Sequence, residues 1–143
     1  MWCKALYFAL LLTLAYGECP CRFSEDNIVV CERNAISVFP DDFLDKCPEL
    51  ASTDLQAFDL QGQRISYLGP DSFKDFPNLV SLLISFNKIQ EVDKDAFRNL
   101  VYLDTLSLQY NSIEKLPTGL FDGLISLKSL DVRNNPASDY VTE

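Results

Sequence analysis

Hydrophobic residues recur along residues 55–135 with a period of 24 positions. Counted from Leu55, Leu79 and Leu103, apolar side chains stand at offsets 0, 3, 5, 10, 13, 18 and 21 of three consecutive units. In the second unit these are Leu79, Leu82, Ile84, Ile89, Val92, Phe97 and Leu100. An incomplete fourth unit begins at Leu127. Self-similarity at this period predicts a solenoid, because one unit buries its apolar face only by stacking on its neighbours.

The repeated pattern resembles the leucine-rich repeat family, in the form found in extracellular proteins with a phenylalanine near the end of each unit. The resemblance covers residues 19 to about 136. It implies an α/β solenoid with one short parallel strand per repeat on a concave face and irregular or helical turns on the convex face. The stretch "LPTGLFDGL" is similar to the repeats of variable lymphocyte receptors. The family also includes innate immune receptors, adhesion and guidance proteins and matrix proteoglycans, and the motif does not choose among them.

Two repeated positions predict ladders of side chains inside the stack. Asparagine at offset 8, with Gln63 in the first unit, is expected to satisfy backbone groups that turn inward where each strand ends. The rungs of this structural ladder are Asn87, Asn111 and Asn135. Phenylalanine at offset 18 is expected to form a stacked spine on the convex side. Its members are Phe73, Phe97 and Phe121.

The stretch "SLLISFNKI", residues 81–89, holds apolar side chains that simple periodicity cannot assign to one face. The 24-residue register places Leu82, Ile84 and Ile89 in the core. Leu83 and Phe86 do not fall at core offsets. Offsets 2, 4, 6 and 7 are expected to point outward on the concave side. Most side chains at these offsets are small or polar, such as Ser85 and Ser107.

Three large side chains at the concave offsets are predicted to cluster in the two central units, namely Leu83, Phe86 and Tyr110. Polar side chains flank them at Asp59, Gln61, Gln109, Asp131 and Arg133. An aromatic centre with a polar rim is the usual anatomy of a protein-binding site. The alternative is that isolated apolar residues on a surface need no explanation. Because the three cluster, the binding interpretation is favoured.

The N-terminus predicts secretion. Residues 1–17 combine Lys4, an apolar run and small residues before Gly17, as a cleaved signal peptide does. The alternative, an uncleaved anchor, would need roughly 20 apolar residues. Behind this segment we expect a cysteine-rich cap at residues 18–54, repeats at 55–135 and a short tail at 136–143. No other apolar run reaches membrane length, so we expect an extracellular protein without membrane insertion.

Four cysteines remain after the predicted cleavage, Cys19, Cys21, Cys31 and Cys47, and they predict two disulfides in an oxidising compartment. Four cysteines allow three connectivities. The resemblance to the family's N-terminal cap implies Cys19–Cys31 and Cys21–Cys47. A redox pair would need two residues between its cysteines, and a zinc site would have to use thiolates alone, so both are disfavoured. The sequence of the cap also fits a modified repeat that starts at Asp26, with Val29, Asn34 and Ile36 at offsets 3, 8 and 10.

At the other end, "LDVRNNP" resembles the start of the family's C-terminal cap but continues as "ASDYVTE". The last strand, around residues 129–133, is therefore expected to have an open edge, where another chain can pair. Homo-association through this edge and a fragment of a longer membrane receptor both remain open.

Charge and composition narrow the chemistry. The chain carries a net charge of −9, and loss of Lys4 would leave 11 basic and 21 acidic residues, a net of −10. This argues against nucleic acid and anionic membranes as partners. With no histidine, nucleophiles backed by histidine and histidine metal sites are excluded. Asp93 and Asp95 lack the six or more oxygens of a calcium site. We expect no enzyme activity, no cofactor and no metal.

These observations predict a secreted module that binds an extracellular protein or a glycan on its concave face. The alternative is a matrix or assembly component that uses the open C-terminal edge. Fold alone does not decide between them.

Overall fold

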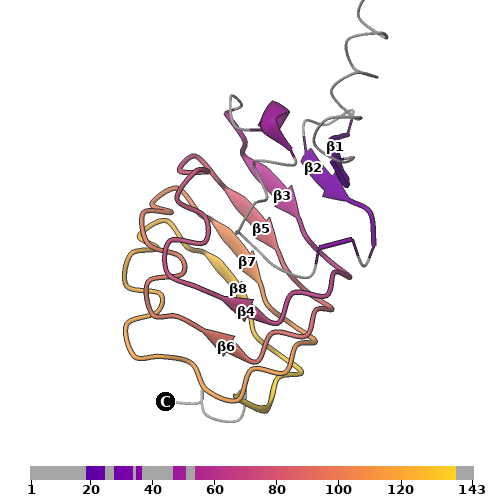
Figure 1. Ribbon diagram of the computed structural model, residues 1–143. Coiled ribbons are helices and arrows are strands. Elements are labelled where there is room, and N and C mark those ends of the chain that lie inside the picture. Colours follow the sequence, from indigo (N-terminus) through magenta and orange to yellow (C-terminus); the bar gives the residue numbers. More distant parts are fainter. Residues whose placement is uncertain (1–18, 25–27, 34, 37–46, 51–53, 138–143) are drawn as a thin grey trace, which may run out of the picture.

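The computed structural model describes residues 19–24, 28–33, 35–36, 47–50 and 54–137, and the predicted signal segment and Asn34 lie outside this part. The described chain winds as a coil whose turns lay successive strands side by side (Figure 1). The sheet has the order β1-β2-β3-β5-β7-β8. Its strands are β1 (Cys21–Phe23), β2 (Ile28–Cys31), β3 (Ala57–Asp59), β5 (Ser81–Leu83), β7 (Thr105–Ser107) and β8 (Ser129–Asp131).

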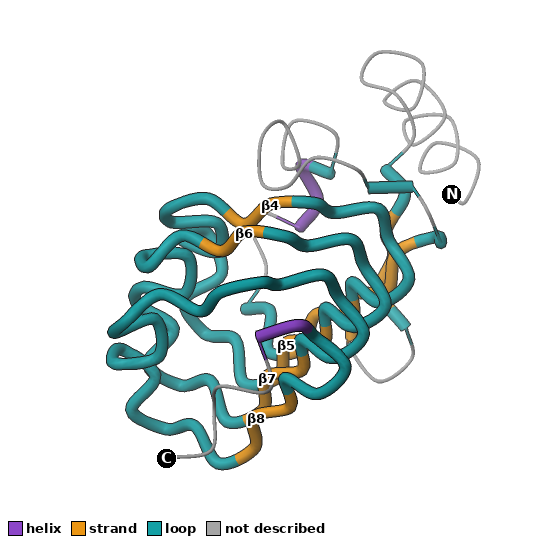
Figure 2. The backbone as a smooth tube through the Cα atoms, turned by 90° about the horizontal axis from the view of Figure 1, so that it is seen from below, coloured by secondary structure: helices purple, strands orange, loops and turns teal. Residues whose placement is uncertain are grey.

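The strands pair in the 24-residue register that the sequence predicts. From β2 to β8 the pairing is parallel, and it aligns Phe58, Leu82, Leu106 and Leu130 in one row, of which the first three are buried. The predicted solenoid with a parallel sheet is thereby confirmed. A second parallel pair, β4 (Tyr67–Leu68) with β6 (Glu91–Val92), lies on the opposite side of the coil (Figure 2). The described residues contain little helix, with a 3-10 turn η1 at Pro48–Leu50.

Phenylalanine stacking fills the interior on the side away from the long sheet. The ring of Phe97 lies 5.9 Å from that of Phe73 and 6.4 Å from that of Phe121, with an angle of 13° between the planes in each pair. Phe73 and Phe97 are fully buried, whereas Phe121 is half-buried. The predicted spine is confirmed, and the rings of successive units bury one another.

The N-terminal cap continues the sheet as a modified repeat. β2 pairs with β3 so that Val29 is aligned with Phe58, and both side chains are buried. β1 folds back on β2 as an antiparallel neighbour and forms the edge of the sheet. Ile36, the predicted offset-10 residue of the cap, is also buried. The cap therefore covers the apolar face of the first unit with side chains in the same rows.

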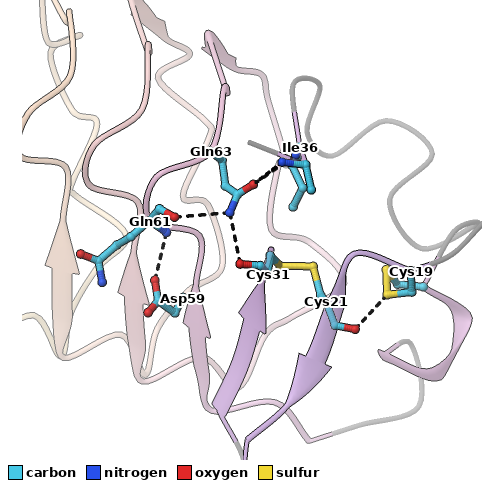
Figure 3. Close-up of a disulfide and its surroundings, with 9 residues drawn as sticks. Cys19, Cys21, Cys31, Ile36, Asp59, Gln61 and Gln63 are labelled. Atoms are coloured by element: carbon cyan, nitrogen blue, oxygen red, sulfur yellow. Dashed lines mark hydrogen bonds between the residues drawn. A yellow bond between two sulfur atoms is a disulfide. The ribbon is translucent and has the colours of Figure 1, made fainter. Parts of the chain in front are cut away.

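The disulfide pairing that the family resemblance implied is wrong. The bonds are Cys21–Cys31 and Cys19–Cys47, although the prediction that all four cysteines are joined is correct. The reason is the antiparallel pairing of β1 and β2, which sets Cys21 directly opposite Cys31. Their Cα atoms are 3.9 Å apart, inside the limit of about 7 Å beyond which two cysteines cannot be bridged. Figure 3 shows the bond between Cys21 and Cys31, with Cys19 outside the strand. Cys19 pairs with Cys47.

Candidate functional site

The offset-8 asparagines sit beneath the concave sheet and hold its strand ends. In the central rung, the amide nitrogen of Asn111 donates to the carbonyls of Leu108 at 2.9 Å and Ile84 at 3.1 Å, and its amide oxygen accepts the N–H of Ile89 at 3.1 Å. Asn87 and Asn135 make the equivalent bonds one unit away. All three are buried, so the structure gives them a backbone role away from any ligand.

Gln63 occupies the same offset where the first unit meets the cap. Its amide oxygen accepts the N–H groups of both Ala35 and Ile36 at 3.1 Å. Its amide nitrogen lies 3.4 Å from the carbonyl of Cys31 (Figure 3). Cys31 and Ile36 stand at offsets 5 and 10 of the cap, the same offsets at which Asn87 bonds Leu60 and Ile65 of the first unit. Glutamine therefore joins the disulfide-bonded cap to the repeats.

The backbone turns left-handed at offset 7 in every unit, just before the ladder residue. The φ angles there are +67° at Gly62, +58° at Phe86, +54° at Tyr110 and +57° at Asn134. Glycine and asparagine tolerate this conformation, but bulky side chains rarely adopt it. The repeat register predicts that offset 7 lies on the concave face but does not predict its left-handed conformation. The signal was present, because Gly62 and Asn134 hold this offset in the outer units.

Phe86 and Tyr110 are the most exposed large hydrophobic side chains at the concave offsets of the described chain. Their rings stack with centroids 4.5 Å apart and an interplanar angle of 9°. Phe86 is 52% exposed and Tyr110 48% exposed. Residues held in sparsely populated backbone conformations gather at functional sites. Two bulky rings on left-handed backbone, both open to solvent, are the strongest candidate for a contact surface.

A hollow of about 470 Å³ lies beside Phe86, toward the cap. It brings together two of the predicted rim residues, Asp59 and Gln61, with Phe86. It also adds Val30 and Arg33, which sequence analysis missed. The modified repeat that starts at Asp26 assigns these two residues offsets 4 and 7, so the register contained the information. The side chain of Arg33 covers Gly62, with its Cγ 3.7 Å from the place a Cβ would take.

At the far end of the concave face, Arg133 and Asp131 form a salt bridge with each other. The guanidinium of Arg133 donates to both carboxylate oxygens of Asp131, at 3.0 and 2.8 Å. These hydrogen bonds hold the pKa of Asp131 below its usual value and raise the pKa of Arg133. Both aspartates accept the backbone N–H two residues further on, at 2.9 Å for Asp59 and 3.1 Å for Asp131, but Asp59 has the neutral Gln61 in the place of Arg133. The two predicted aspartates are therefore not equivalent, because only Asp131 is neutralised by a neighbour.

The centre of the face is more closed than the sequence predicts. Ser85 and Ser107, expected to point outward, are buried with exposures of 1% and 8%. Their hydroxyl oxygens are 2.7 Å apart, so one hydroxyl donates a hydrogen bond to the other. Leu83 and Gln109 are half-buried. Within the predicted cluster, the rings of Phe86 and Tyr110 are therefore more accessible to a ligand than Leu83 is.

Three sulfur atoms in the cap, from Cys19, Cys21 and Cys47, lie within 4.8 Å of one another. Each belongs to a disulfide, whereas a metal ligand must be a thiolate. This cluster is therefore structural in the oxidised protein. None of the helical segments in the described part of the chain has the length and apolarity of a membrane-spanning helix.

Comparison with known proteins identifies the family to which the fold belongs. The leucine rich repeat family matches residues 53–103 and again residues 77–136, more than half of the chain. No curated protein matches the sequence significantly. Among solved structures, the Toll–Spätzle complex of Drosophila matches with 25% identity and a TM-score of 0.62, over 73% of this chain and 15% of that one. The TLR13–ssRNA13 complex matches with 26% identity and a TM-score of 0.61, over 87% of this chain and 20% of that one.

The chain thus spans a fifth or less of the solved proteins that it resembles. Its repeat register, asparagine ladder and parallel sheet agree with the family match over the same residues. The chain belongs to the leucine-rich repeat family.

Proposed function

We propose that this chain is a secreted recognition module whose concave face binds an extracellular protein without chemical turnover. One observation carries the proposal: Phe86 and Tyr110 stack, half-exposed, on left-handed backbone. A bulky residue in this conformation costs about 1–2 kcal/mol relative to glycine. Stability alone would favour glycine or asparagine here, as in the outer units. Binding by the rings supplies a reason for keeping them.

The structural neighbours support a binding role and leave the ligand open. The two solved complexes pair Toll with Spätzle and TLR13 with a single-stranded RNA. For this chain a net charge of −9 favours a protein over a nucleic acid, whose phosphates it would repel. The two disulfides in the cap suit an oxidising compartment. A glycan is the alternative ligand on the same face.

The proposal is tested by a binding screen of the secreted full chain against arrayed extracellular proteins and glycans. For a bound partner, Phe86→Ser is expected to weaken affinity by about thirtyfold or more, as for a binding hot spot. Leu83→Lys should also weaken it, because the change adds a charge and bulk to the same face. Tyr67→Ser is the matched control, since Tyr67 is 47% exposed on β4, across the coil. Full affinity in both concave variants would contradict the concave site.

Assembly through the end of the sheet is a second candidate function. Leu130 on β8 is 38% exposed, whereas its row neighbours Leu106 and Leu82 are fully buried. A second copy or another protein could cover this end and extend the sheet. Sedimentation of the wild type and of Leu130→Lys at micromolar concentration tests it. A wild-type protein that is monomeric throughout would contradict homo-association.

A further inference from the structure

A second surface with apolar character lies on the flank of the coil, where each return segment leads into a concave strand. A hollow of about 460 Å³ there is lined by residues at offsets −1 and +1 of all four units. These are Asp54, Gln56, Asn78, Val80, Tyr102, Asp104, Ser126 and Lys128. None of them belongs to the concave site. With strands about 4.8 Å apart, four units span about 14 Å, the length of four extended residues.

Exposed apolar side chains border this hollow. Val80 is 39% exposed and Tyr102 59% exposed, and both line it. One position before Tyr102 and Ser126 stand Val101 and Ile125, which are 36% and 80% exposed. The two rows are adjacent, because the hydroxyl of Ser126 donates to the carbonyl of Val101 at 2.6 Å. Single exposed apolar residues are ordinary, but a contiguous group along one flank indicates a contact surface.

The backbone carbonyl groups at offset +1 of the flank already accept hydrogen bonds from the neighbouring unit. The carbonyls of Gln56, Val80 and Asp104 each accept two N–H groups from the next unit. A ligand that adds a strand by main-chain hydrogen bonds would have little to bind here. Recognition must therefore come from side chains, through apolar contact and charge.

The charged side chains of the flank favour a ligand that carries a basic group. Asp104 is paired with Lys128 at 2.5 Å. Asp54 accepts a hydrogen bond from the neutral amide of Asn78, and within the described part of the chain no lysine or arginine forms a salt bridge with it. The chain as a whole carries −9, so a second copy would bring like charge to an already acidic molecule. A partner with a basic side chain gains from both the local carboxylate and the net charge.

We propose that this flank is a second docking surface, which takes an extended protein segment with apolar side chains and a lysine or arginine. The apolar side chains contact Val80, Tyr102 and Ile125, and the basic group lies at Asp54. The concave face stays free, so one molecule can bind two partners at once. This inference is independent of the concave site.

A phage-displayed random peptide library, panned on the full disulfide-bonded chain, provides the probe. Enriched sequences are expected to combine two apolar residues with a lysine or arginine. Their synthetic peptides should bind with a Kd below about 1 mM and more weakly at high salt. Ile125→Ser and Asp54→Asn should each weaken binding about tenfold. Phe86→Ser, and Glu91→Gln as a charge-matched change on β6, should leave binding unchanged.

Other outcomes overturn the proposal. Peptides that lose binding with Phe86→Ser would belong to the concave face. Enriched sequences without a basic residue, or binding indifferent to Ile125→Ser, would remove the flank as the site, and so would the absence of any peptide within that affinity range. If sedimentation shows a dimer that Ile125→Ser dissociates, the occupant is a second copy. Because Ile125 is 80% exposed, its substitution is not expected to disturb folding.

Discussion

Phe86 and Tyr110 stack at 4.5 Å although both hold a left-handed backbone that glycine or asparagine holds in the outer units. The solenoid fixes this backbone, because the chain must turn inward at offset 7 to bring the next residue into the ladder. The side chain at that offset is free to vary. Local strain and ring exposure thus occur at the same two residues, which is where stability and function are expected to conflict.

This conflict predicts a reversal of the usual ranking of glycine and alanine. At position 86, Phe86→Gly should be more stable than Phe86→Ala by about 1 kcal/mol, because alanine keeps the left-handed penalty and glycine removes it. Both variants lose the same ring contact, so the difference isolates the backbone. Urea unfolding of the two variants measures it.

Tyr67 provides the control for this comparison. It is 47% exposed on β4, and its φ is not positive. There Tyr67→Gly should be less stable than Tyr67→Ala, by about 0.5–1 kcal/mol, because glycine loses more backbone entropy on folding. The same ranking at both positions would contradict the assigned strain at Phe86.

The ladder predicts a pH-dependent defect in Asn111→Asp. The aspartate can still accept the N–H of Ile89 but, once ionised, cannot donate to the carbonyls of Ile84 and Leu108. Leaving buried acceptors unsatisfied costs about 1–3 kcal/mol each. Burial beside carbonyl oxygens should raise the pKa of this aspartate, since its neutral form restores a donor.

A folded-state pKa above the unfolded value makes the neutral form the stabilising one. The stability gap between Asn111→Asp and the wild type should therefore be largest at pH 7 and shrink as the pH falls toward about 4. Thermal unfolding across this range is the measurement. Asn111→Ala, which cannot titrate, is the control, and its gap should stay nearly constant. Parallel curves for the two variants would argue against a donor role for the amide.

The repeat could be predicted from sequence because its evidence is redundant. Seven apolar offsets recur in three units, and the strands pair in the same 24-residue register. The cap was predicted less well because it occurs once. Its register gave Val29 and Ile36 correctly, but the disulfide partners depended on the β1–β2 hairpin, which no repeat encodes. Ser85 and Ser107 were misplaced because burial of a small hydroxyl depends on its neighbours.

For the candidate contact surface, the sequence indicated which residues lie on the concave face better than how they contact one another. It singled out Phe86 and Tyr110 from their offset, but nothing in the register distinguishes Asp59 from Asp131. The difference arises because Arg133 lies two residues after Asp131, whereas Gln61 stands at the matching place after Asp59. Backbone conformation was missed because an aromatic at a left-handed position is an exception to propensity.

The disulfide pairing makes a prediction for the single variant Cys47→Ser. The structure pairs Cys47 with Cys19, so the free thiol should be Cys19. The alternative pairing implied by the family would free Cys21. Alkylation of the denatured protein at low pH, where thiolate exchange is slow, followed by fragment sequencing identifies the labelled residue. Label on Cys21 alone would contradict the hairpin pairing, and wild-type protein with no label provides the control.

A surface ion pair between the first two units makes the last prediction. The Nε atom of Arg98 donates to Asp71 at 2.9 Å and its Nη2 atom donates at 2.5 Å. The hydrogen bond from Arg98 is the largest cause that lowers the pKa of Asp71 below 3.8. A lowered folded-state pKa contributes stability above the unfolded pKa and loses it as the pH falls through the folded value.

The gap in unfolding free energy between the wild type and Asp71→Asn should hold from pH 7 to about 5 and close below about 4. The gap should be small and should narrow further in high salt, because the pair is exposed. Asp75→Asn removes the same charge without touching Arg98 and should show no such closing. A gap for Asp71→Asn that persists to pH 2 would show that the substitution acts through something other than the ion pair.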